Sequence, residues 1–273
     1  MTTNPFTPQH ELLRESFRQF VETEIKPNVK YWEENKICER EVFRKMGGQG
    51  FFGVSFPEAY GGSGMDMWSA VVISEELTKA NIGGLSMSLY AHTYLPLPVV
   101  MALGTEEQKQ KYLVPALKGE KVAALGITEP GAGSDVANIR CTAKREGDHY
   151  IINGSKTFIT NGYYGNFVTV AVKTDPDAGM AGISLIVVDR DTPGFTKTKL
   201  KKMGWKSSDT AELFFDNVKV PVTHLVGNEG QGFFYIMESF QLERLVAGIL
   251  AIAGCERAID TTLKYMNERA AFG

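Results

Sequence analysis

The feature that most constrains this chain is a change of hydrophobic periodicity along its length. Apolar residues follow helical spacing in residues 1–120, alternate as in strands in residues 121–226, and return to helical spacing in residues 227–273. A helix buries a stripe of period 3.6, whereas a strand buries every second residue, so one regular architecture cannot serve all three segments. The sequence therefore predicts a multidomain α+β chain: an N-terminal helical domain, a middle antiparallel β barrel or sandwich, and the first long helix of an incomplete C-terminal bundle.

Helix signals are frequent in the N-terminal segment. Thr7 followed by Pro8 predicts a capped helix start, after which the apolar residues fall on one face as far as about residue 27. Asp66 predicts a second cap, and Thr105 with Gln108 has the spacing of a capping box. Further helices are expected over residues 40–46 and 86–103.

Short strands fill the middle segment. Runs of β-branched and aromatic residues are separated by Gly, Pro, Asn and Asp, with no helical pattern between them. This arrangement is typical of an antiparallel barrel or sandwich of about 100 residues. The expected strands cover residues 139–143, 150–152, 167–172, 183–188, 195–200 and 212–218.

The last segment has no proline between residues 229 and 272. At 1.5 Å per residue it would form a helix of roughly 60 Å, longer than a compact domain normally holds. Such a helix needs bundle partners. We therefore expect a chain that is cut inside a domain, or one that borrows packing from another subunit.

Composition excludes several functions. With 29 Lys and Arg against 32 Asp and Glu, the net charge of −3 does not provide the positive field that a nucleic-acid binder needs. Cys38, Cys141 and Cys255 are far apart and the histidines are scattered, so no disulfide framework and no metal site are expected. No apolar run is long enough to span a membrane, and the N-terminus lacks the character of a transit peptide. We expect a soluble protein of the bacterial cytoplasm, with the mitochondrial matrix as the alternative.

Two loops could carry chemistry. In ITEPGAGSD (127–135), Gly131 and Gly133 would let backbone N–H groups approach a ligand, although a simple crossover turn would have the same composition. The spacing matches neither a dinucleotide-binding glycine motif nor a phosphate-binding loop. NGSKTFITNG (153–162) places an apolar triplet between two Asn-Gly signals, which predicts a hairpin.

Glu243 is the candidate acid–base residue. It falls on an apolar helical stripe with Ile236, Phe240, Ala247, Leu250 and Gly254. Burial there would raise the pKa of the carboxyl group and suit it to proton abstraction. A structural salt bridge with Arg244 or with a residue elsewhere in the fold is the alternative.

These features together resemble the acyl-CoA dehydrogenases. Besides ITEPGAGSD and NGSKTFITNG, the resemblance rests on LGTEEQKQKYLVPALKGE (103–120), KKMGWKSSDTAELFFDNVKVP (201–221) and NERAAFG (267–273), in this order along the whole chain. It implies FAD bound between the β domain and a C-terminal four-helix bundle. Family members are usually longer, so it also implies a C-terminal truncation that removes the last bundle helices and part of the flavin site.

The resemblance assigns roles to individual residues. Thr128 would bond the pyrimidine side of the flavin, Thr160 would approach N5, Phe158 would lie against the ring where many members carry tryptophan, and Arg269 would reach the FAD diphosphate of a neighbouring subunit. The implied FAD-binding set is Leu125, Gly126, Ile127, Thr128, Gly133, Ser134, Phe158, Ile159, Thr160, Arg269 and Phe272.

Glu243 matches the base of the long-chain and isovaleryl-CoA members, which carry it on the long helix after the β domain. The implied substrate contacts are Ser134, Phe240, Gln241, Leu242 and Arg244. The expected reaction is oxidation of a saturated acyl-CoA to the trans-2-enoyl-CoA in fatty acid β-oxidation. A homotetramer built from dimers and an electron-transferring flavoprotein as acceptor are implied as well. A non-catalytic fragment or interaction module, and another flavin oxidation such as that of nitroalkanes, remain as alternatives.

Overall fold

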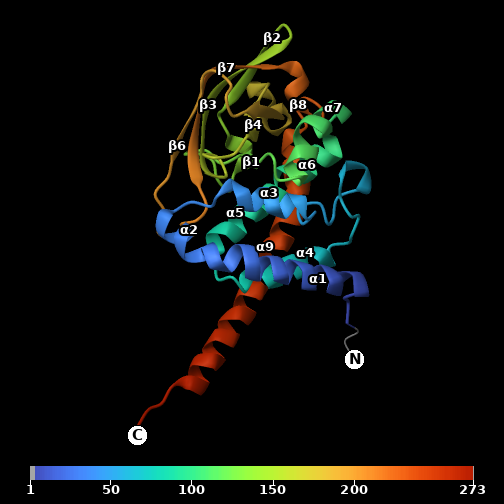
Figure 1. The fold of residues 1–273 in the computed structure, drawn as a ribbon. Helices are drawn as coiled ribbons and strands as arrows, with labels where there is room; N and C mark the ends of the chain where they lie inside the picture. Colours follow the sequence, from blue (N-terminus) through green and yellow to red (C-terminus); the bar gives the residue numbers. More distant parts are fainter. Residues whose placement is uncertain (1–3, 273) are drawn as a thin grey trace.

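The computed structural model describes residues 4–272, in which helices come first, a sheet follows and one long helix ends the chain (Figure 1). The helices of the first part are α1 Pro8–Phe20, α2 Val29–Asn35, α3 Arg40–Gly48, α4 Trp68–Thr78, α5 Gly83–Tyr94, α6 Pro96–Leu103, α7 Glu106–Gln108 and α8 Val114–Leu117. The strands are β1 Ala123–Gly126, β2 Thr142–Glu146, β3 His149–Thr160, β4 Phe167–Lys173, β5 Ile183–Asp189, β6 Phe195–Lys199, β7 Thr210–Pro221 and β8 Leu225–Val226. The last helix is α9 Gly232–Glu268.

The helix starts expected at Thr7 and Thr105 are confirmed. The Thr7 hydroxyl accepts the backbone N–H of His10, with proline in the first turn, and Thr105 and Gln108 form the capping box. Asp66 accepts the N–H of Trp68, the first residue of α4, at 2.9 Å, but the residue in the N-cap position is Met67, so this prediction is one residue off. The single helix expected over residues 86–103 is wrong, because Leu95 (φ −104°, ψ −75°) separates α5 from α6. Pro96 cannot donate the hydrogen bond that would continue α5, and its ring disfavours helical geometry at the residue before it.

The β domain is one eight-stranded sheet, in the order β6-β7-β3-β2-β4-β5-β8, with β1 paired to β4. The prediction of a middle β domain is confirmed, but the sheet is not closed and it is not wholly antiparallel. β1 runs parallel to β4, and Thr142 of β2 also pairs with Lys173 in the parallel sense. These pairings join strands that are distant in the sequence, so local turn signals could not reveal them.

The predicted hairpin at residues 153–162 is wrong. Residues 149–160 form the single strand β3, which pairs with β7 and carries irregularities after Ile152 and after Lys156. Gly154 has a φ of +139°, and a Cβ atom there would lie 2.7 Å from the Cα of Cys141. The first Asn-Gly pair therefore marks a bulge, where only glycine allows the close approach, and the turn comes at Asn161 and Gly162.

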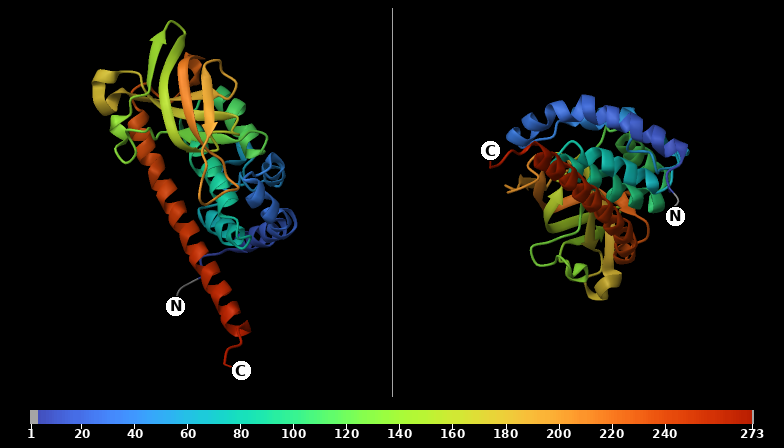
Figure 2. Two further views of the ribbon diagram at one scale, coloured as in Figure 1. Left: turned by 90° about the vertical axis from the view of Figure 1, so that its left-hand side faces the viewer. Right: turned by 90° about the horizontal axis from the view of Figure 1, so that it is seen from below.

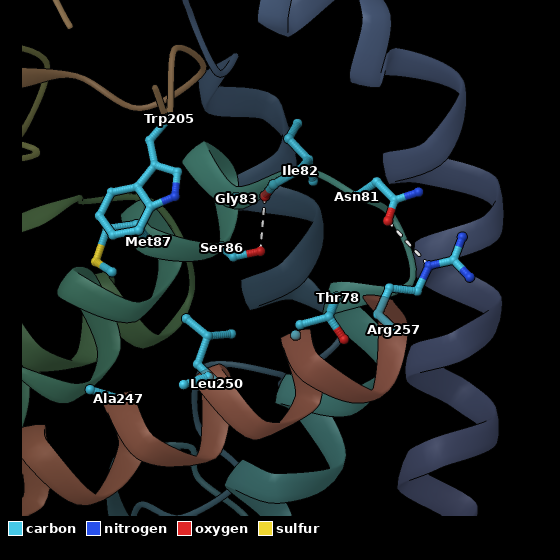
Figure 3. Close-up of a pocket in the computed structure, with 12 residues that line it drawn as sticks. Thr78, Asn81, Ile82, Gly83, Ser86, Met87, Trp205, Ala247, Leu250 and Arg257 are labelled. Carbon is cyan, nitrogen blue, oxygen red and sulfur yellow. Dashed lines mark hydrogen bonds between the residues drawn. The ribbon is translucent and has the colours of Figure 1, made fainter. Parts of the chain in front are cut away.

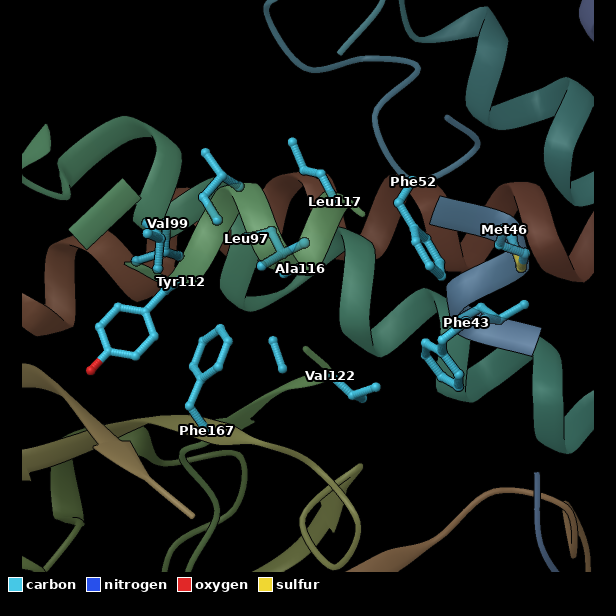
Figure 4. Close-up of a cluster of buried hydrophobic side chains, with 14 of the residues drawn as sticks. Phe43, Met46, Phe52, Leu97, Val99, Tyr112, Ala116, Leu117, Val122 and Phe167 are labelled. Atoms are coloured by element: carbon cyan, nitrogen blue, oxygen red, sulfur yellow. The ribbon is translucent and has the colours of Figure 1, made fainter. Parts of the chain in front are cut away.

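Strands β4 and β5 are buried on both faces. Their even-numbered residues, such as Val168 and Ile186, point into the core inside the curved sheet. Their odd-numbered residues, such as Phe167 and Leu185, join the core of the helical domain, where Phe167 lies beside Tyr112 and Val122 (Figure 4). This two-sided burial fixes the helical domain against the sheet.

Helix α9 packs beside the sheet and α4 and then extends past both (Figures 1 and 2). The stripe expected from the sequence is confirmed as far as Glu243, since Ile236 is buried and Phe240 and Glu243 line a cavity against the helical domain. Farther along α9 it is only partly buried: Ala247 and Gly254 are exposed, and the buried residues there are Val246 and Ala253. Toward its C-terminal end α9 exposes large apolar side chains, which are Ile252, Ile259, Leu263, Tyr265 and Met266.

These exposed residues predict self-association of the 273-residue chain, because an apolar helix face of this kind favours burial against another surface. Replacing Ile259 and Leu263 together by lysine should shift the chain toward monomer in sedimentation velocity. Leu12→Lys is the matched control, since Leu12 is similarly exposed on α1. A stable monomer of the unsubstituted chain at micromolar concentration would contradict the prediction.

Candidate active site

A cavity of about 210 Å³ lies where the ends of β1 and β3 meet α5 and α9. Residues implied by the resemblance line it from three segments that are distant in the sequence: Leu125, Ile127 and Thr128; Phe158, Ile159 and Thr160; and Phe240 and Glu243. The sequence did not identify the other lining residues, Met87, Ala91 and Leu95, because they lie on or beside α5, which is buried on nearly all sides, so that no one face stands out in its pattern.

The walls of the cavity combine apolar side chains with polar ones, and two of the polar ones are hydroxyl groups without partners among the described residues. Thr128 and Thr160 are half-buried, and their side chains make no hydrogen bond within residues 4–272. Leu125, Ile127 and Ile159 supply apolar surface between them. A slot of this kind suits a flat aromatic ligand that has polar groups along its edges.

Phe158 has an unusual backbone conformation. Its φ of +61° is rare for a residue with a side chain, and it falls at the second irregularity of β3. Phe158 is 69% exposed although it lines the cavity. Strained backbone of this type is concentrated at functional sites, so the exposed ring is a candidate contact for a ligand.

A buried ion pair that the sequence analysis missed holds the loop after β1. Lys156 is fully buried, and its Nζ lies 2.7 Å from Oε1 of Glu129 and 3.0 Å from the carbonyl oxygen of Ile127. Burial lowers the pKa of Lys156, and the nearby Cys141 and Glu129 oppose that shift. The sequence around Lys156 gave no signal of this burial, because polar residues, Ser155 and Thr157, flank the lysine in β3.

Three residues of the implied FAD set near this loop do not line the cavity. Gly126 faces the inside of the sheet, where an added Cβ atom would lie 3.2 Å from Val168 and 3.6 Å from Cγ of Lys156. Gly133 and Ser134 are exposed in the turn that follows Glu129. In this structure Gly126 makes room for the buried lysine stem.

Glu243 reaches the cavity from α9. It is half-buried, and within residues 4–272 its carboxylate has neither an ion-pair nor a hydrogen-bond partner. Burial raises the pKa of Glu243, and the charge of Arg244 opposes this shift only in part. Arg244 is exposed and lies over the Phe240 ring, 5.7 Å from its centroid, so the side chain is directed away from an ion pair with Glu243.

The remaining implied residues lie outside the cavity. Gln241 is exposed, and Leu242 packs with Tyr90, Tyr94 and Val246. Arg269 donates to the Tyr265 hydroxyl at 3.3 Å near the exposed end of α9, and Phe272 is fully exposed. With 1.5 Å of rise per residue, the end of α9 is roughly 40 Å from Glu243, so Arg269 and Phe272 do not reach the cavity within one chain.

A second groove of about 480 Å³ lies beside the first and shares Met87 with it (Figure 3). It lies between α5 and α9, with Trp205 at one side and an Arg257–Asn81 hydrogen bond of 3.1 Å at its end. Among residues 4–272 no cluster of acidic, histidine and cysteine side chains could hold a metal ion. None of the helices in that range combines the length and the apolar character needed to cross a bilayer.

Comparison with known proteins identifies the family. The model described as "Acyl-CoA dehydrogenase, N-terminal domain" matches residues 7–120, the middle-domain model matches residues 124–218, and the C-terminal-domain model matches residues 230–273. A short-chain-specific acyl-CoA dehydrogenase of Clostridium acetobutylicum is 41% identical over 98% of this chain and 70% of its own length. The chain belongs to the acyl-CoA dehydrogenase family.

Other family members show how much of a relative the chain covers. The mouse mitochondrial long-chain-specific acyl-CoA dehydrogenase is 41% identical over 98% of this chain, which spans 63% of the mouse protein. The crystal structure of an acyl-CoA dehydrogenase from Geobacillus kaustophilus superimposes with a TM-score of 0.95 at 46% identity, covering all of this chain and 72% of that one. The fold predicted from the sequence is thus that of the family.

Because the pKa of Glu243 is raised, we expect the stability difference between the Glu243→Gln variant and the unsubstituted chain to change with pH. A folded-state pKa above the ordinary value of 4.5 means that the native chain loses stability as the pH rises through the interval between the two values. Glu243→Gln removes this loss. The melting temperature of the variant minus that of the unsubstituted chain should therefore increase by roughly 1–3 °C from about pH 4 to about pH 7.

Glu238→Gln, which alters an exposed carboxylate on the same helix, is the matched control and should show no such trend. If the Glu243→Gln variant instead loses relative stability toward pH 7, Glu243 has an ion-pair partner and the structural alternative is supported.

Proposed function

We propose that the flavin ring of FAD and the thioester end of an acyl-CoA meet at this cavity, and that the site desaturates the acyl group between Cα and Cβ to give the trans-2-enoyl-CoA. The observation that carries this proposal is Glu243, a half-buried carboxylate without a partner among the described residues, in a cavity whose other walls carry the unpartnered hydroxyls of Thr128 and Thr160. Membership of the acyl-CoA dehydrogenase family supports it.

The residues present fit FAD. Leu125, Ile127 and Ile159 offer apolar contact to a flat ring system, and the hydroxyls of Thr128 and Thr160 can donate to its polar edges. Phe158 would cover an exposed part of the ring. When bound, FAD supplies the oxidation by accepting the β hydrogen with its electron pair.

Glu243 would act as the base. The α C–H of a thioester is a very weak acid, so its removal needs a carboxylate held in place and donors for the developing enolate oxygen. Burial disfavours the charged carboxylate, so Glu243 binds a proton more tightly than an exposed glutamate does, and its pKa is raised. The proton moves from the substrate Cα to Glu243, and the electron pair of that bond forms the Cα=Cβ bond as the β hydrogen leaves.

Roles outside the cavity form part of the same proposal. Gln241, Leu242, Arg244 and Ser134 would contact the bound acyl-CoA only if its CoA part extends beyond the cavity. Arg269 and Phe272 would contact the FAD of a second subunit, in a homotetramer built from dimers. An electron-transferring flavoprotein would reoxidise the flavin.

A non-catalytic fragment with the same fold is the competing proposal. It predicts that the protein does not bind FAD.

The two hydroxyls give a test of FAD binding. Thr128→Val and Thr160→Val should each lower FAD affinity by about 5–10-fold, the loss of roughly one hydrogen bond, measured by the change in flavin fluorescence on titration. Thr196→Val on β6, an exposed position that does not line the cavity, is the matched control. Wild-type affinity in both cavity variants would contradict the proposed FAD contacts.

The role of Glu243 is tested by single-turnover reduction of the FAD-loaded protein. Glu243→Gln keeps the shape of the side chain but removes the proton acceptor, so the rate of flavin bleaching by acyl-CoA should fall at least about 100-fold while FAD is still bound. Glu238→Gln should bleach at the wild-type rate. Rapid bleaching in the Glu243→Gln variant would exclude Glu243 as the base.

A further inference from the structure

The ion pair between Lys156 and Glu129 has no part in the chemistry proposed above. Lysine is almost never fully buried unless it is paired, and a buried pair often contributes less to stability than apolar residues of the same size would. Lys156 is 0% exposed and Glu129 is 7% exposed. The position of this pair in the fold therefore needs an explanation other than stability.

The pair ties the short segment that follows β1 to Lys156 on β3 and to the backbone just before β2. Lys156 donates to the Glu129 carboxylate at 2.7 Å and to the Ile127 carbonyl at 3.0 Å. The same carboxylate accepts the backbone N–H of Arg140 at 2.6 Å and of Cys141 at 2.9 Å. One cation thus holds the chain at Ile127 and at Glu129, the residues on either side of Thr128.

Lys156 lies on β3, the strand that also carries Phe158 and Thr160 in the opposite wall of the cavity. Lys156 precedes Phe158 by two residues on β3, just before the irregularity at which Phe158 adopts its φ of +61°. The N–H of Thr157 donates to the carbonyl of Thr128 at 2.9 Å, which adds a direct bond between the two segments. These contacts link the wall that carries Thr128 to the strand that carries Thr160.

We propose that Lys156 and Glu129 are a positioning pair that fixes the width of the flavin slot and the direction of Thr128. The inference rests on the proposed function, in which FAD occupies this slot. Neither side chain lines the cavity, so the pair acts through the backbone of Ile127, Thr128 and Thr157.

The helical domain offers a matched control. Glu76 is also 0% exposed and is paired with Arg18 at 2.9 Å and with Lys79 at 2.8 Å, joining α1 to α4. Neither α1 nor α4 contributes a residue to the cavity. Glu76→Gln should therefore lower stability without changing the flavin slot.

The test compares Lys156→Met with the double variant Lys156→Met/Glu129→Gln. The single variant leaves an unpaired buried carboxylate and should be destabilised, whereas the double variant carries no buried charge and should recover much of its melting temperature. If the pair positions the slot, FAD affinity should stay at least about tenfold below wild type in both, because the bonds to Ile127 and the carboxylate are gone. Recovery of FAD affinity together with the melting temperature would overturn the proposal.

A measurement without FAD separates this proposal from the proposed function. Hydrogen exchange of the peptide covering residues 123–135 should accelerate in Lys156→Met and in the double variant, but not in Glu76→Gln. Unchanged exchange in Lys156→Met would overturn the positioning pair even if FAD binds. Failure of the wild-type chain to bind FAD, with accelerated exchange in the variants, would instead overturn the proposed function, and with it the role of the pair toward a flavin.

Discussion

The burial of β4 and β5 on both faces is the constraint on which the rest of this structure depends. A sheet covered on one face only could close around its own core and stand apart from the helices. Here odd-numbered apolar residues of both strands, such as Phe167 and Leu185, belong to the same core as the helices of the N-terminal domain. The helical domain and the sheet therefore share one interior, and β1, which pairs with β4, is held between them.

The cavity is a consequence of this arrangement. β1 leaves the helical domain, runs beside β4 and ends where α5 and α9 approach the sheet, so its last residues cannot be covered by either domain alone. Leu125 points toward the helices and the cavity, whereas Gly126 points into the sheet against the stem of Lys156. The buried charge pair then holds the chain at the point where regular strand geometry stops.

Much of the fold followed from local signals. The caps at Thr7 and Thr105, the middle β domain and the long last helix were all predictable, because each depends on neighbouring residues and on hydrophobic spacing. The parallel β1–β4 pairing and the bulge at Gly154 were not, since both are set by contacts with residues distant in the sequence. The break at Leu95 has a local signal in Pro96, but the continuous apolar pattern of residues 86–103 favoured a single helix there. The candidate site was likewise predictable only in part. Its three segments could be assigned to one site only through the family resemblance, and the role of Lys156 depends on a burial that no local pattern indicates.

An anaerobic titration tests the proposed oxidation of a saturated acyl-CoA by FAD at this cavity. FAD-loaded protein is mixed with saturated acyl-CoAs of increasing chain length, and the absorbance of oxidised flavin is followed. We expect that at least one acyl-CoA bleaches the flavin and that the matching trans-2-enoyl-CoA appears in equal amount. Bound FAD that no saturated acyl-CoA bleaches would contradict it.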